Sequence, residues 1–312
     1  MASVRVVAQA KVNLFLRVLA REASGYHQLE TLFCRLALGD EVRVRVTEDG
    51  RSLDCDGPAV PEGGLGPVER NLAWRAATAF LEKTGWSTGF AIEIEKRIPV
   101  GGGLGGGSAD AGGVLRALNA LAPAPLTDHA LLRLGATLGA DVPFLTQGDS
   151  PLALAWGRGD RLLVLPPLPA RPCLLFTFPS GVPTADAYRW LTEAPAAAPS
   201  AAAYRLAGLS SWRDVEVMAY NEFERVVLPR HEVLRGVVTG LRRPELSEAF
   251  DVVLMSGSGA TVFVLPASHA PDAEREELYV EIGIDPSVET ATPVEVLETS
   301  TAAHVEPVRV DD

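Results

Sequence analysis

The sequence predicts a two-domain chain in which strands and helices are mixed. Apolar residues alternate with period two in several segments, and amphipathic helical patterns lie between them. A proline-rich stretch at residues 165–169 predicts a domain boundary. With 312 residues, 47% of them hydrophobic, the chain can form two cores. We therefore expect domains over residues 1–165 and 166–284, followed by a peripheral or partly disordered tail over residues 285–312, in which a final strand is possible.

The first half is expected to hold most of the strands. The patterns predict strands at residues 4–10, 12–18, 29–38, 42–46 and 90–98, and helices at residues 71–83, 109–121 and 130–138. Residues 54–66 are rich in Gly and Pro and are expected to form a loop. Lys11 and Asn13 stand one strand period apart, so we expect them on one strand face.

From residue 153 on, strand and helix patterns follow one another. Strands are expected at residues 153–165 (two short strands joined at 157–159), 173–178, 251–255 and 261–265, and helices at residues 221–227 and 232–241.

Six glycines fall within the seven positions 101–107, between a predicted strand and a predicted helix. A glycine backbone can turn tightly and lie close to a ligand, and the free N–H groups of a helix N-terminus favour an anion. This arrangement predicts a phosphate site. A flexible linker would show more polar residues, and a P-loop would place a lysine before Ser108. A dinucleotide fingerprint needs an acidic residue about 20 positions later, where Thr127-Asp128 is more typical of a helix cap.

Composition narrows the class of protein. The formal charge of −12 and pI of about 5.0 disfavour a nucleic-acid binder. Three widely spaced cysteines and five scattered histidines predict neither a disulfide framework nor a metal site. No apolar run reaches the ~20 residues of a membrane span, and no signal-peptide pattern opens the sequence. We therefore expect a cytoplasmic protein with no membrane partner; its oligomeric state is not predicted.

Five segments together resemble the GHMP kinases. They are Ala-Lys-Val-Asn-Leu-Phe-Leu at residues 10–16, Gly-Tyr-His at 25–27, the glycine loop through Ser108, Gly-Ala-Asp-Val-Pro-Phe at 139–144 and Met-Ser-Gly-Ser-Gly-Ala at 255–260. The resemblance covers residues 5–265. It implies an α+β, two-domain GHMP kinase fold, with an N-terminal domain like ribosomal protein S5 domain 2 and a ferredoxin-like C-terminal domain. The glycine loop marks the superfamily. The first, second and fourth segments are most similar to the branch that phosphorylates the 2-hydroxyl of diphosphocytidyl methylerythritol, on the non-mevalonate route to isoprenoids.

The resemblance also implies catalytic residues. Asp141 would be the general base, and Lys11 would keep that carboxylate ionised and stabilise the developing alkoxide. Asn13 would bond the acceptor hydroxyl or Asp141. Taken alone, Asp141 could be a turn residue and Lys11 a solvated strand charge.

ATP and Mg²⁺ are the implied cofactors. The phosphates would lie in the loop formed by Pro99, Val100, Gly101, Gly102, Gly103, Leu104, Gly105, Gly106, Gly107, Ser108 and Ala109. Ser108 would lie near phosphate and Mg²⁺, and Lys96 and Asn71 would approach the adenine. The family usually has a second serine where this chain has Ala109, which leaves only a backbone role there. Asp110 is expected to cap the helix.

The small-molecule partner implied by the resemblance carries a cytidine diphosphate. Tyr26 and His27 would stack on and hydrogen-bond the base, and Thr184 and Tyr188 would complete the site. Residues 256–259 would back the glycine loop and line the acceptor pocket. Two alternatives are open: another GHMP kinase, of the homoserine or mevalonate type, or a non-catalytic ATP-binding relative.

Overall fold

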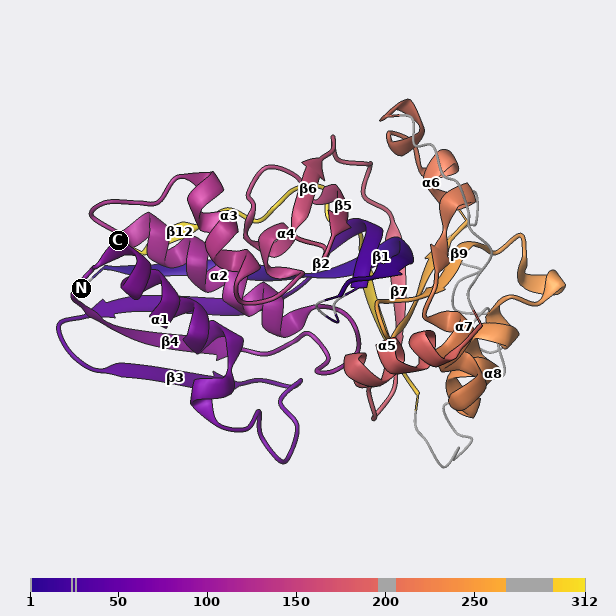
Figure 1. The fold of residues 1–312 in the computed structure, drawn as a ribbon, viewed down its shortest axis with the longest axis horizontal. Helices are drawn as coiled ribbons and strands as arrows, with labels where there is room; N and C mark the ends of the chain where they lie inside the picture. The colour runs from indigo at the N-terminus through magenta and orange to yellow at the C-terminus, as the bar shows by residue number, and fades with distance from the viewer. Residues whose placement is uncertain (1, 24, 26, 196–205, 268–293, 312) are drawn as a thin grey trace.

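The computed structural model describes residues 2–23, 25, 27–195, 206–267 and 294–311, and these form two β-sheets with helices packed on them (Figure 1). The larger sheet belongs mainly to the first half of the chain and the smaller one to the second half. The α+β class expected from the sequence is confirmed. The division at residue 165/166 stays a prediction.

Two long antiparallel strands are the centre of the larger sheet. β1 (Ser3–Arg21) pairs along its length with β2 (His27–Thr47), and the order is β12-β1-β2-β4-β3. The sequence predicted each of these strands as two separate segments. Register shifts in the pairing, among them one between Gln9 and Lys11, let each strand continue through the interrupted pattern.

Shorter strands complete this sheet. β4 (Gly89–Glu95) pairs antiparallel with β2 and parallel with β3 (Arg51–Asp56). β5 (Leu152–Gly157) joins β2 and forms a hairpin with β6 (Arg161–Val164), as expected. The loop expected from residue 54 is wrong in its first residues, because Leu53 and Cys55 pack on the core and extend β3 to Asp56.

Four helices pack in the N-terminal half. They are α1 (Leu72–Thr84), α2 (Gly106–Leu121), α3 (Asp128–Ala136) and α4 (Val142–Thr146). Asn71 caps α1 and Thr127 caps α3 through side-chain oxygens, as their residue types favour. α2 is buried along most of its length. A Cβ at Gly112 would lie 2.6 Å from the Leu145 carbonyl oxygen, so this glycine lets α4 pack closely on α2.

The smaller sheet is antiparallel, in the order β11-β7-β10-β9. Its strands are β7 (Pro172–Thr177), β9 (Phe250–Met255), β10 (Val262–Pro266) and β11 (Glu295–Ser300). The helices of this half are α5 (Thr184–Glu193), α6 (Trp212–Met218), α7 (Glu224–Val227) and α8 (Glu232–Leu241), with 3-10 turns at Val68–Arg70, Leu206–Leu209, Leu228–Arg230 and Pro244–Leu246.

The helix expected at residues 221–227 begins only at Glu224. Tyr220–Asn221 instead forms the short strand β8 beside β1. The side-chain amide of Asn221 donates hydrogen bonds to the carbonyl oxygens of Met255 and Gly257, at 2.6 and 2.8 Å. These bonds fix Asn221 in an extended segment.

Residues 294–311, which belong to the tail expected from the sequence, pair with both sheets, and residues 285–293 of that tail lie outside the described residues. β11 is an edge strand of the smaller sheet, and β12 (Arg309–Asp311) is an edge strand of the larger one. Between them, Thr301 bridges to Leu36, and Gln9 exchanges hydrogen bonds with the backbone of residues 304 and 306. We name residues 294–311 the C-terminal strap, drawn in yellow in Figure 1.

Candidate active site

A cavity of about 660 Å³ is lined by residues of both halves of the chain. The first half contributes the glycine loop, the middle of β1 and the turn before α4, and the second half contributes residues 182–184, 188, 223, 257 and 258. The cavity therefore brings together four of the five segments that carry the family resemblance, all but residues 25–27.

The three side chains expected to be catalytic meet in this cavity. The Lys11 ammonium donates to Asn13 Oδ1 at 2.8 Å and lies 3.4 Å from Asp141 Oδ2. Lys11 is only 4% exposed, so its charge acts where water screens it little. The solvated-strand interpretation of Lys11 is wrong, because the strand is buried on both faces here.

Asn13 is held by a residue that the sequence analysis missed. Its Nδ2 donates to Thr31 Oγ1 at 2.8 Å, and Thr31 in turn donates to the Phe15 carbonyl oxygen at 2.6 Å. These bonds orient the Asn13 amide so that its oxygen faces Lys11. Thr31 comes from β2, and only the β1–β2 register could have identified it.

Asp141 occupies the N-cap position of α4, yet its side chain makes no capping hydrogen bond to the described backbone. The carboxylate points instead to Lys11, with 29% of the side chain exposed to the cavity side. A carboxylate that is not occupied in capping and is reachable by solvent can accept a proton from a substrate.

The glycine loop is held from two sides. Gly101 and Gly103 have φ of 78°, and Gly105, at the N-cap of α2, has φ of 74°, which only glycine adopts readily. From β1, the Lys11 amide donates to the Leu104 carbonyl oxygen at 2.9 Å.

Residues 256–261 pack against the other side of the loop. Ser256 Oγ donates to the Gly103 carbonyl oxygen at 2.9 Å, and the Thr261 amide donates to the Gly102 carbonyl oxygen at 3.1 Å. Gly257 and Ser258 line the cavity. These contacts agree with the expectation that this motif backs the loop.

Ser108 lies in the first turn of α2 and lines the cavity, while Ala109 is buried. A Cβ built on Gly139 would lie 4.0 Å from Ser108 Oγ, so the hydroxyl is next to the turn that carries Asp141. Among the described residues, no group of three His, Cys, Asp or Glu side chains could hold a metal ion.

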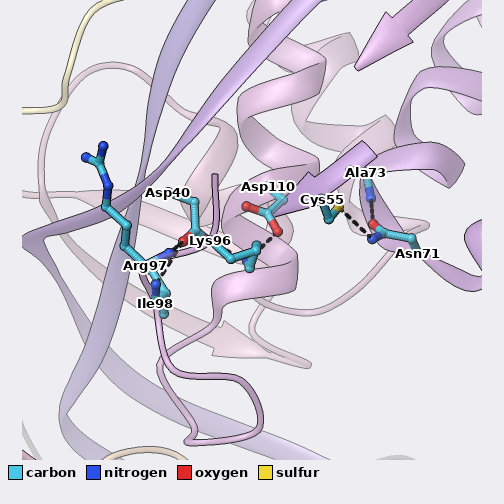
Figure 2. A network of polar contacts seen from close by, with 8 residues as sticks. All are labelled: Asp40, Cys55, Asn71, Ala73, Lys96, Arg97, Ile98 and Asp110. Atoms are coloured by element: carbon cyan, nitrogen blue, oxygen red, sulfur yellow. Dashed lines mark hydrogen bonds and ion pairs between the residues drawn. The ribbon is translucent and has the colours of Figure 1, made fainter. Parts of the chain in front are cut away.

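The Lys96 side chain, expected to approach the adenine, is instead bound within the protein. Its ammonium is buried between the carboxylates of Asp40 and Asp110, with Asp110 Oδ2 at 2.6 Å (Figure 2). Its backbone N–H and C=O are bonded to Asp56 and Ala59. Lys96 lines the cavity, but the structure leaves little of it free for a base, and its adenine contact stays a prediction.

The capping role expected for Asp110 is wrong. Gly105 is the N-cap of α2, and Asp110 lies one turn inside the helix with its carboxylate bonded to Lys96. Asn71 accepts a hydrogen bond from the Ala73 amide at 2.9 Å and lines the cavity near Cys55. Its role beside adenine also stays a prediction.

A second cavity, of about 760 Å³, adjoins the first and shares Ala140, Thr184 and Tyr188 with it. His27 stacks on Tyr188, with ring centroids 4.6 Å apart and planes 19° apart. Phe223, which the sequence analysis missed, makes an edge-to-face contact with Tyr188, with ring centroids 4.9 Å apart. Thr184 bonds Ser258 at 3.0 Å. Tyr26 lies outside the described residues.

Both rings of this stack are neutral near pH 7. Burial raises the pKa of Tyr188 to about 12, and the charge of Asp141 adds to the rise. Burial, helped by Arg21, lowers the pKa of His27 below its ordinary value. The pair thus offers flat uncharged faces together with polar edges, as a nucleobase requires.

No helix among the described residues is long and apolar enough to cross a membrane.

Similarity to known proteins agrees with the site. The GHMP kinases N terminal domain model matches residues 71–149. A 4-diphosphocytidyl-2-C-methyl-D-erythritol kinase of Pelobacter propionicus is 38% identical over 270 residues, covering 85% of this chain and 90% of the relative. The enzyme of that name from Deinococcus radiodurans is 41% identical over 264 residues, covering 83% and 82%.

Solved structures show the same similarity. A crystal structure of 4-(cytidine 5'-diphospho)-2C-methyl-D-erythritol kinase is 34% identical with a TM-score of 0.68, covering 96% of this chain and 99% of that one. A homoserine kinase from Cytophaga hutchinsonii is 20% identical with a TM-score of 0.65, covering 99% and 97%, and supports the fold alone.

Proposed function

The chain belongs to the GHMP kinases, in the family of 4-diphosphocytidyl-2-C-methyl-D-erythritol kinases, and we propose that it transfers the γ-phosphate of ATP to the 2-hydroxyl of that diphosphocytidyl polyol. The observation that carries the proposal is the Lys11–Asp141 pair, 3.4 Å apart, in one cavity with the glycine loop. The homoserine- and mevalonate-type alternatives have only fold similarity in their favour.

Asp141 accepts the proton of the 2-hydroxyl as the oxygen attacks the γ-phosphorus. Phosphoryl transfer depends mostly on positioning and on neutralising charge. The Lys11 ammonium lies beside Asp141 and stabilises the negative charge that develops on the attacking oxygen. Asn13, fixed by Thr31, holds Lys11 in this position and keeps it from turning away.

The glycine loop binds the triphosphate through its amides and the first turn of α2. The chain's donor set fits Mg²⁺, which binds through few protein ligands when phosphate oxygens and water supply the rest. Ser108 is the residue that would hold it. When bound, the ion neutralises charge on the phosphates.

The cytidine end of the substrate binds at Tyr188. A base between two rings needs about 7 Å between their planes, twice an ordinary carbon–carbon contact. The His27–Tyr188 centroid distance of 4.6 Å is too short for that. Cytosine therefore takes the Tyr188 face after His27 has moved aside, and His27 then hydrogen-bonds the base edge. Tyr26 and Thr184 complete this part of the proposal.

The test is ADP release by the purified protein with the diphosphocytidyl substrate. We expect Asp141→Asn to lower kcat by about 10²–10⁴-fold, the usual contribution of a general base, and Lys11→Met to do the same. Both variants are expected to bind an ATP analogue and to unfold at the wild-type temperature. Asp128→Asn, an acidic residue of α3 outside the cavity, is the matched control.

Two results would contradict the proposal in different ways. Absence of ADP release by the wild type would remove the substrate assignment. Asp141→Asn activity above a tenth of wild type would remove the base assignment while leaving the substrate in place.

A further inference from the structure

The buried Asp40–Lys96–Asp110 cluster has no part in the chemistry above, yet it lies at the two ends of the glycine loop (Figure 2). Lys96 follows β4 directly and is three residues before Pro99. Asp110 is in α2, three residues after Gly107. The Lys96–Asp110 ion pair therefore connects the chain just before the loop to the chain just after it.

Asp40, in β2, binds the segment that comes just before the glycine loop. Its Oδ1 accepts the backbone N–H groups of Arg97 and Ile98, at 2.6 and 2.8 Å, and its Oδ2 accepts from Lys96. Asp40 is fully buried, so it is held in one position. The strand end, the loop and the helix start are thus tied to β2 through one side chain.

The charges of this cluster do not balance when both carboxylates are ionised. One ammonium faces two carboxylates, and all three side chains are at least 96% buried. Asp110 Oδ1 has no hydrogen-bond partner among the described residues. An unpaired buried carboxylate oxygen is costly, which favours a proton at this position.

The pKa values agree with that charge count. Burial raises the pKa of Asp110 to about 7; Asp40 adds to the rise, and Lys96 opposes it. Burial lowers the pKa of Lys96, but the two carboxylates more than offset it, so the pKa of Lys96 lies above its ordinary value. The groups that face Asp110 are Lys96, Asp40 and the thiol of Cys55, whose pKa burial raises to about 11.

We propose that Asp110 is a positioning residue for the nucleotide: with Lys96 and Asp40 it closes the base of the glycine loop and sets how tightly the loop amides bind a triphosphate. The proposal rests on the proposed function. The Lys96–Asp110 ion pair holds the two ends of the loop at a fixed separation, so that the loop amides converge on one triphosphate. Without the Asp110 carboxylate, that separation is no longer fixed.

The experiment measures the dissociation constants of a non-hydrolysable ATP analogue and of cytidine diphosphate for each variant, at one pH and one salt concentration. Asp110→Ala should weaken the ATP analogue at least tenfold and leave cytidine diphosphate within twofold. Asp110→Asn keeps an oxygen that can accept a hydrogen bond from Lys96, so its affinity for the ATP analogue should stay within threefold of wild type.

Glu216→Gln is the matched control, because it removes a carboxylate from the half-buried ion pair with Arg171, outside the cavity. It should change neither ligand's affinity. Asp110→Ala with wild-type ATP affinity, or with equal losses for both ligands, overturns the proposal. If Asp110→Ala does not fold, Asp110→Leu decides, because it fills the buried space but offers Lys96 no oxygen; an ATP-analogue affinity within twofold of wild type then overturns the proposal. A wild type that binds no ATP analogue overturns the proposed function itself.

Discussion

Replacing Gly103 by alanine tests whether the glycine loop depends on its close contact with the second half of the chain. A Cβ at this position would lie 2.2 Å from the Ser256 carbonyl oxygen, which is backbone and cannot swing away. To relieve this clash, the loop and residues 256–259 must separate by about 1 Å. A displacement of that size at a reacting group costs about 100-fold in rate.

Gly101→Ala is the matched control, because Gly101 has the same φ of 78° but its nearest neighbour to a Cβ is 4.0 Å away. Both variants carry the cost of an alanine in the left-handed region, about 1–2 kcal/mol, which is roughly tenfold in affinity. Only Gly103→Ala adds the displacement. We therefore expect kcat/KM for ATP to fall about tenfold in Gly101→Ala and about 100-fold or more in Gly103→Ala.

The assay is steady-state ADP release at varied ATP, with thermal unfolding of each variant beside it. If Gly103→Ala loses no more activity than Gly101→Ala, the contact with Ser256 does not position the loop. The reasoning from the two glycines would then be wrong.

Three further predictions concern other parts of the molecule. Tyr188→Ala should weaken cytidine diphosphate at least tenfold in a direct binding titration, whereas Tyr188→Phe should retain it; equal losses would contradict stacking. Arg35→Met should lower the free energy of unfolding by about 2–5 kcal/mol in urea denaturation, because two buried carbonyl oxygens at the end of α4 lose their donor; a loss under 1 kcal/mol would contradict this. Burial raises the pKa of Cys34 to about 12 and also raises that of Cys173, so neither thiol should react with a disulfide reagent at pH 8 unless the protein is unfolded; because Cys55 is half-buried, rapid reaction of more than one thiol in the native protein would show that these residues are accessible.

The parts of the fold that sequence reasoning predicted well are those with local signals. The glycine loop lies between β4 and α2 as expected, and Thr127 caps α3 because its hydroxyl can reach a backbone N–H three residues on. The helix expected at residues 71–83 agrees with α1 within one residue. In each case the information lies within a few residues of sequence.

What could not be predicted depends on pairing between distant segments. Asp40 and Lys96 are 56 residues apart, and only the antiparallel register of β2 and β4 brings them together. Thr31 reaches Asn13 through the β1–β2 register for the same reason. The resemblance to known kinases assigned Lys11 and Asp141 to one site, but it carried no information about the cluster under the loop.

The C-terminal strap has a consequence for synthesis of the protein. Asp311 pairs with Ser3, and Glu295 pairs with Thr177, so an edge of each sheet forms only after residues 295–311 have left the ribosome. Contacts between such distant residues are slow to form because a long chain must first close on itself. Neither sheet can reach its final set of strands during translation of the first half, and the two sheets should gain their last strands together.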